Sequence, residues 1–208
     1  MDDVAYLEAK YGSSPGLARV GPDNQDPVYF VYDSYHIADN EWRAVLLPSD
    51  YSEGDGGNSP KSKQTKELEQ QQQPVGRRRS VRGVFVGLWL DREHGASLAR
   101  SGFDAFYTYF ASGGFSYGSS PQLWPRMVQE ARQLGLSSVL SVGPGYVDDR
   151  IRPWNAHNTK ARQGGKYYAA MCRAALEAKP DALSVTSYNE WLEEGRQRMN
   201  RGQVCLLY

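Results

Sequence analysis

Two carboxylates near the C-terminal end of the chain have a spacing that is typical of acid–base catalysis. Glu190 and Glu193 lie three residues apart, with Asn189 before the first and Trp191 between them. Glycoside hydrolysis commonly uses a pair of carboxylates, and an aromatic ring offers a sugar a flat surface to stack on. The same residues are also typical of a helix start, because Asn is a good cap and acidic residues favour a first turn. Spacing alone leaves both interpretations open.

A second segment combines a flexible turn with polar and aromatic residues. A Gly-Pro-Gly turn begins at Gly143, and it is followed by Tyr146 and, after a charged stretch, by Trp154. The glycines allow a close backbone approach, and the mixture suits a polyhydroxylated ligand. A turn-rich connection held by Arg–Asp pairs would have the same composition.

A third segment places two tyrosines at alternating positions. Tyr107 and Tyr109 flank Thr108, so strand alternation predicts that both rings lie on one face. We expect them to form a wall that faces a ligand. A fourth segment, with Asp91 and His94, is a weaker candidate, because a helix-capping Asp91 and a solvent-exposed His94 explain it better than an acid–base pair does.

Each of these segments follows an apolar run that is typical of a buried strand. The expected strands are Pro27–Tyr32, Val84–Leu90, Ala105–Phe110, Ser137–Gly143 and Ala182–Tyr188. The expected helices are Asp2–Tyr11, a short turn at 95–102, Pro121–Gly135 and Gly165–Lys179. This alternation predicts βα units around a buried parallel sheet, where functional groups lie at the carboxyl ends of the strands.

Helical spacing also predicts which side chains these helices bury. The expected helix Pro121–Gly135 should bury Leu123, Met127, Val128, Ala131 and Leu134. The expected helix Gly165–Lys179 should bury Tyr168, Met171, Cys172, Ala175 and Leu176.

The overall composition argues against several classes of protein. The chain has 208 residues, with 24 basic and 24 acidic side chains, so zero net charge gives no support for a nucleic-acid partner. Its two cysteines and three scattered histidines show no metal-ligand spacing, and we expect neither a metal nor a cofactor. No apolar run approaches the roughly 20 residues of a membrane span, and the N-terminus does not have the pattern of a signal peptide.

The chain divides into four parts by composition. Residues 1–50 and 81–194 have the apolar patterns of ordered structure, whereas 51–80 is a low-complexity segment that we expect to be a disordered insert. Residues 195–208 form a divergent tail. A complete (β/α)8 barrel takes about 250 residues, so if these units form a barrel, the chain carries only part of it.

The motifs then occur in the order that is found in one family. These are YFVYDSY (29–35), YTYFA (107–111), SVGPGY (141–146), IRPWN (151–155), GKYY (165–168) and SYNEW (187–191). In them the chain resembles the glycoprotein endo-α-1,2-mannosidases, and their endomannosidase-like paralogue in particular. The resemblance implies a Golgi enzyme with a (β/α)8 barrel, and we expect this chain to form a partial TIM-type barrel, the C-terminal half of one. Such an enzyme cuts an internal α-1,2-mannosidic bond of a glucosylated high-mannose N-glycan, with retention and without a metal or cofactor.

The resemblance also implies roles for individual residues. Glu190 would act as a base on the 2-hydroxyl of the substrate, and Glu193 as the general acid and then the general base. Tyr109, with Tyr107 as the alternative, would lie beside the reacting sugar. The remaining substrate-binding residues would be Tyr146, Trp154, Asn189 and Trp191.

The chain departs from the family pattern directly after the first glutamate. Leu192 stands where the family has His, and the Gly and Gln that follow arrive one position late. An insertion here would make Glu194 the acid/base instead of Glu193. The alternative hypothesis is therefore a catalytically inactive truncated isoform or a glycan-binding pseudoenzyme, acting as a partner of the full-length paralogue.

Overall fold

A single curved sheet forms the centre of the molecule. The computed structural model describes residues 2–47, 82–110, 112–147 and 153–187. The strands lie in chain order in one six-stranded sheet, and only the first pairing, between β1 and β2, is antiparallel. The strands are β1 (Arg19–Val20), β2 (Asp26–Val31), β3 (Val84–Leu88), β4 (Ala105–Tyr107), β5 (Ser137–Val142) and β6 (Ala182–Val185). The βα units predicted from the sequence are confirmed.

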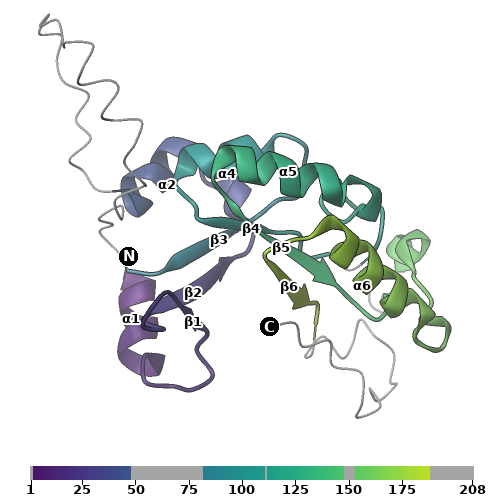
Figure 1. Cartoon of the computed structure of the whole chain (residues 1–208), viewed down its shortest axis with the longest axis horizontal. Helices are drawn as coiled ribbons and strands as arrows, with labels where there is room; N and C mark the ends of the chain where they lie inside the picture. The colour runs from purple at the N-terminus through teal and green to yellow at the C-terminus, as the bar shows by residue number, and fades with distance from the viewer. Residues whose placement is uncertain (1, 48–81, 111, 148–152, 188–208) are drawn as a thin grey trace, which may run out of the picture.

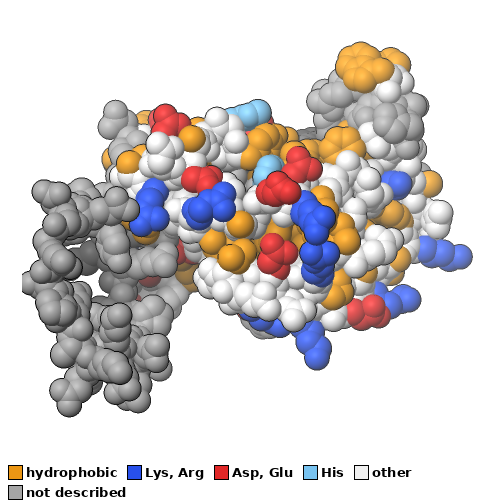
Figure 2. Space-filling view, turned by 90° about the horizontal axis from the view of Figure 1, so that it is seen from above, with side chains coloured by type: hydrophobic (Ala, Val, Ile, Leu, Met, Phe, Trp, Pro, Cys, Tyr) orange, Lys and Arg blue, Asp and Glu red, His pale blue; other side chains and the backbone are white. Residues whose placement is uncertain are grey.

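Four helices cover one face of this sheet. Figure 1 shows α2, α4, α5 and α6 along that face, while α1 lies beside β1 and β2. The helices are α1 (Asp2–Tyr11), α2 (Asp39–Leu46), α4 (His94–Ser101), α5 (Trp124–Leu134) and α6 (Lys166–Ala178). Short 3-10 helices occupy Ser34–His36, Pro121–Leu123, Pro153–Asn158 and Gln163–Gly165. The outward side of the helical layer carries acidic and basic side chains interspersed, as a solvated surface does (Figure 2).

The main core lies between the sheet and the helices. Its largest fully buried side chains include Trp89, Phe106, Trp124, Met127 and Leu140. A second, smaller cluster lies on the opposite, inner face of the sheet, where Val86, Leu88, Ala105, Tyr107 and Val139 are buried together. The strands are therefore apolar on both faces, which explains why they lack a simple alternation of apolar and polar residues.

Ring contacts on the inner face show how strongly the sheet curves. Phe30 of β2 meets Tyr107 of β4 edge to face, with the ring centroids 5.1 Å apart, although β3 lies between these two strands. In a TIM barrel, each interior layer is filled by side chains from alternate strands. The contact across β3 is such a layer, and the sheet is about half of a barrel, as predicted.

The structure corrects several details of the predicted elements. The segment at 95–102 belongs to an eight-residue helix, and the sequence patterns did not reveal α2 or β1. Leu134 and Leu176, which we expected to be buried, are exposed. Leu134 is the last residue of α5, which buries Trp124 at its start, and Leu176 lies near the end of α6, which buries Ala178. The predicted insert at 51–80 and the tail at 195–208 lie outside the described residues.

Candidate active site

Aromatic side chains gather where the parallel strands end. Tyr32 directly follows β2, and Tyr107 ends β4, with Tyr109 two residues later. The rings of Tyr32 and Tyr109 are in edge-to-face contact, with their centroids 4.8 Å apart, and Tyr109 also lies 6.2 Å from Tyr107. Phe110 extends the same cluster through a 5.1 Å contact with Tyr109. The structure therefore brings the two predicted tyrosines together and adds residues to them.

The rings of Tyr32, Tyr107 and Tyr109 form a wall, which we call the tyrosine wall, with an exposed part and a buried part. Tyr32 has 51% of its surface exposed, whereas Tyr107 is buried beneath it. Burial raises the pKa of Tyr107, and the negative charge of Asp33 acts in the same direction. Its hydroxyl therefore stays protonated at neutral pH and can donate a hydrogen bond. Sequence reasoning placed Phe30 and Tyr32 in a strand but missed their part in the wall, which their alternation with Val31 could have revealed.

Tyr109 has an unusual backbone conformation. We expected a strand from Ala105 to Phe110, but β4 ends at Tyr107, and Tyr109 has a φ of 52°. The Phe110 amide donates to the Thr108 carbonyl at 2.7 Å, which closes a three-residue turn around Tyr109. A positive φ is uncommon outside glycine, so this turn, and not continued strand alternation, directs the tyrosine ring.

A buried serine fixes the end of β2 against β3. The Ser34 hydroxyl accepts a hydrogen bond from the Leu88 amide at 2.9 Å, and the Ser34 carbonyl accepts one from the Trp42 indole at 2.7 Å. The chain enters this arrangement through Asp33, which has a left-handed φ of 52°. Tyr32 therefore leaves β2 on a backbone that is held from two sides.

The loop after β4 is anchored at Gly118. Its amide donates to the Leu90 carbonyl, and its carbonyl accepts a hydrogen bond from the Trp124 indole at 2.8 Å. A Cβ at this position would lie 2.0 Å from the carbonyl oxygen of Trp89. Glycine is therefore required for the loop to lie against the end of β3. Two buried polar atoms in this region, Trp89 Nε1 and Tyr117 Oη, have no hydrogen-bond partner among the described residues.

His94 does not have the solvent-exposed position that we expected. Its Nδ1 accepts hydrogen bonds from the amides of Leu90 and Asp91, at 3.2 and 3.3 Å, and Tyr35 stacks on the ring. Burial lowers the pKa of His94, against the opposing charge of Asp91. The neutral ring with its proton on Nε2 fits these bonds. Asp91 does not cap α4, since the residue before that helix is Glu93.

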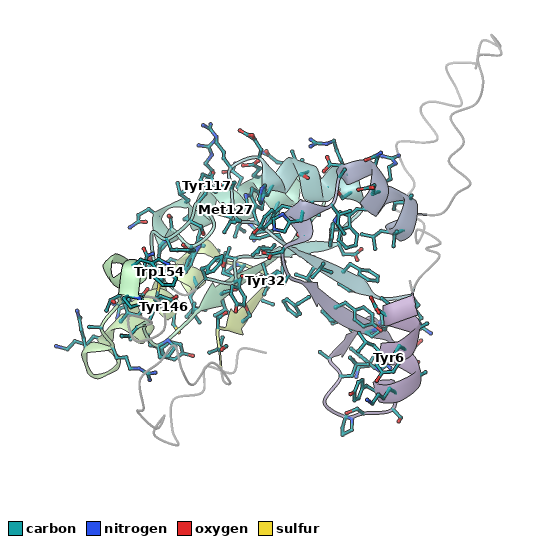
Figure 3. All side chains as sticks on the ribbon, turned by 180° about the vertical axis from the view of Figure 1, so that it is seen from behind. Tyr6, Tyr32, Tyr117, Met127, Tyr146 and Trp154 are labelled. Carbon is teal, nitrogen blue, oxygen red and sulfur yellow. The ribbon has the colours of Figure 1, made fainter. Side chains whose placement is uncertain are left out.

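Tyr146 and Trp154 lie apart from the tyrosine wall. In Figure 3 both are on the side of the molecule formed by the loop after β5, away from Tyr32. Tyr146 pairs with Lys160 through two backbone hydrogen bonds of 2.9 and 2.7 Å. Trp154 is 77% exposed. The described residues therefore do not form one continuous site that includes these two.

The predicted carboxylates follow the last strand of the sheet. Residues 148–152 and 188–208 lie outside the described part, so the positions of Asn189, Glu190, Trp191 and Glu193 stay a prediction. In sequence, Glu190 comes three positions after Ser187, which belongs to the exit of β6. Within the described ranges, no group of His, Cys, Asp and Glu could hold a metal ion. None of the helices in those ranges is long and apolar enough to cross a membrane.

A family model matches almost the whole chain. The model for glycosyl hydrolase family 99 matches residues 1–201. Among curated proteins, the glycoprotein endo-alpha-1,2-mannosidase of Xenopus laevis is 39% identical over 198 residues, covering 94% of this chain and 39% of the relative. The glycoprotein endo-alpha-1,2-mannosidase-like protein of Homo sapiens is 37% identical, covering 94% of this chain and 38% of the relative.

A solved structure has the same fold over most of the chain. The GH99 endo-alpha-mannosidase of Bacteroides thetaiotaomicron superposes with a TM-score of 0.72 and 36% identity, covering 92% of this chain and 49% of that protein. The chain thus spans about two fifths of the length of these curated relatives and about half of the solved structure.

Proposed function

The chain belongs to glycosyl hydrolase family 99, and we propose that it contributes the sugar-binding wall and the two carboxylates of an endo-acting glycoside hydrolase. The observation that carries this proposal is the tyrosine wall of Tyr32, Tyr107 and Tyr109 at the carboxyl ends of the parallel strands. In this fold, active sites lie at that end of the barrel. The two endo-alpha-mannosidases named above, from Xenopus laevis and Bacteroides thetaiotaomicron, are similar to 94% and 92% of this chain, respectively.

The proposed substrate is an α-1,2-mannosidic bond inside a glucosylated high-mannose N-glycan. The names of the curated relatives support the linkage and the internal cut. The wall supports a sugar as ligand, because it combines an exposed ring, that of Tyr32, with a protonated hydroxyl, that of Tyr107. Tyr109 would lie beside the reacting mannose, and Tyr146 and Trp154 would contact more distant sugars of the glycan.

The proposed mechanism retains the configuration at C1 through two inversions. Glu190 takes the proton of the 2-hydroxyl, O2 bonds to C1, and the bond from C1 to the leaving sugar breaks as Glu193 protonates the leaving oxygen. Glu193 then removes a proton from water, which attacks C1. The bond between C1 and O2 breaks, and Glu190 returns its proton to O2. Asn189 and Trp191, on either side of Glu190, would position the substrate.

The family resemblance also supports a cellular setting. N-glycans with glucosylated high-mannose arms are the proposed partner, and the Golgi apparatus is the proposed location, on a membrane-associated protein. No metal or other cofactor takes part in the proposed steps.

The experiment that tests this function is a product assay with single-glutamate variants. The purified chain is incubated with a glucosylated α-1,2-mannoside, and the release of the intact disaccharide is followed by chromatography. Glu190→Gln should abolish release, and so should one of Glu193→Gln and Glu194→Gln, the other serving as its neighbouring control. Absence of release by the unaltered chain, while it still unfolds cooperatively, would contradict the proposal and favour a pseudoenzyme.

A further inference from the structure

A buried hydroxyl network joins the ends of three neighbouring strands beneath the tyrosine wall. The Tyr109 amide, after β4, donates a hydrogen bond of 2.7 Å to the hydroxyl of Ser141 in β5. The Ser141 hydroxyl in turn lies 2.8 Å from that of Ser184 in β6. The Ser141 amide donates to the Thr108 hydroxyl at 2.8 Å. Ser141 and Thr108 are both completely buried.

This network is placed where it can determine the conformation of Tyr109. A non-glycine residue with a positive φ persists only when its surroundings hold it there. The turn around Tyr109 is closed by the hydrogen bond from the Phe110 amide to the Thr108 carbonyl. The Tyr109 amide donates to the Ser141 hydroxyl. The sheet holds both acceptors, because Thr108 directly follows Tyr107, the last paired residue of β4, and Ser141 is paired with Ser184 of β6.

The network also reaches the strand that leads to the predicted carboxylates. Ser141 accepts the Tyr109 amide, so its own hydrogen can be donated to Ser184. Ser184 and Ser141 are register partners in the sheet. A shift of either strand end would therefore change the position of Tyr109 relative to the exit of β6.

We propose that Ser141 is a positioning residue, whose buried hydroxyl holds Tyr109 in its left-handed conformation and in register with β6. Its effect on catalysis rests on the proposed function, whereas its effect on Tyr109 does not. A displacement of about 1 Å at a reacting group can lower a rate about a hundredfold, so Ser141 should affect kcat more than KM.

The test compares two serines of the same strand. Ser138→Ala is the matched control, because Ser138 is also completely buried and its hydroxyl is bonded to Asp181 at 2.7 Å, but it lies at the other end of β5. We expect Ser141→Ala to speed hydrogen exchange of the Tyr109 amide at least about tenfold, since its acceptor is lost, and Ser138→Ala to leave it unchanged. Ser141→Thr keeps the hydroxyl and should restore slow exchange.

The kinetic arm uses the same variants with the glucosylated α-1,2-mannoside. Ser141→Ala should lower kcat at least about tenfold relative to Ser138→Ala, with KM within about threefold, and Ser141→Thr should recover most of it. Unchanged exchange at Tyr109, or an equal loss of kcat in both alanine variants, would overturn the proposal. If the unaltered chain releases no product, the proposed function fails, whereas amide exchange still decides the role of Ser141. If Ser141→Ala does not fold, Ser184→Ala is measured instead, with faster Tyr109 exchange expected and unchanged exchange overturning the proposal.

Discussion

The rings of Tyr32 and Tyr109 meet edge to face at 4.8 Å, although they follow strands that are not neighbours in the sheet. One layer deeper, Phe30 and Tyr107 make the corresponding contact between the same two strands. Both contacts cross the inner face of β3. The curvature of the half-barrel is therefore what assembles the wall, and a flat sheet with the same strand order would keep these rings apart.

The first prediction concerns the packing of α6. Met171→Ala should lower the free energy of unfolding by about 2–5 kcal/mol, because Met171 is only 3% exposed and its removal leaves a cavity. Leu176→Ala on the same helix should change it by less than about 1 kcal/mol, because Leu176 is 47% exposed. Urea unfolding followed by circular dichroism measures both. Equal losses would mean that α6 packs through the face predicted from its sequence.

The second prediction concerns the loop after β4. Gly118→Ala should destabilise the protein by about 1–3 kcal/mol, because the new methyl group would collide with the carbonyl oxygen of Trp89. Gly113→Ala is the control in the same loop, where the nearest atom to a Cβ would be 3.4 Å away. Thermal unfolding of the two variants compares them. Similar midpoints would contradict the close approach of this loop to β3.

The third prediction concerns the pH dependence of stability. Burial lowers the pKa of His94 below its usual 6.5, so the unfolded chain binds a proton more readily than the folded one as the pH falls through that value. The free energy of unfolding should therefore be smaller at pH 5 than at pH 7. Protonation of Nδ1 would also remove the acceptor for the amides of Leu90 and Asp91.

The variant that isolates this effect is His94→Asn, which retains a side-chain acceptor near Nδ1 but does not titrate. Urea unfolding at pH 5 and pH 7 should show a smaller loss of stability for the variant than for the unaltered chain. Parallel losses in both would show that other groups cause the acid sensitivity.

The sequence was informative where a residue's neighbours along the chain determine its structure. The strands at Val84, Ala105, Ser137 and Ala182 were found because continuous apolar runs bounded by turns are typical of buried parallel strands. The helix α2 was missed because it is only eight residues long, and its apolar residues gain stability mainly by packing in the core beside α4.

The site was predictable only in part. Tyr107 and Tyr109 were identified from their spacing, but the left-handed turn at Tyr109 depends on a hydroxyl from the next strand, which no local pattern reveals. The alternation of Phe30 and Tyr32 could have placed both rings on one face, but it could not have predicted the contact of Tyr32 with Tyr109 across β3. The exposed Leu176 shows the same limit, since helical spacing predicts which side of a helix is apolar but not how much of that side the rest of the protein buries.

Sugar binding can be measured directly at the tyrosine wall. The chain is titrated with α-1,2-mannobiose and followed by NMR, beside Tyr32→Ala and the control Tyr6→Ala. Tyr6 is similarly exposed, at 56%, but lies on α1, far from the wall (Figure 3). We predict shifts at Tyr109 and its neighbours, with binding weakened about tenfold or more by Tyr32→Ala and unchanged by Tyr6→Ala. Equal binding by all three proteins, or shifts confined to other parts of the chain, would contradict a role of the tyrosine wall in sugar binding.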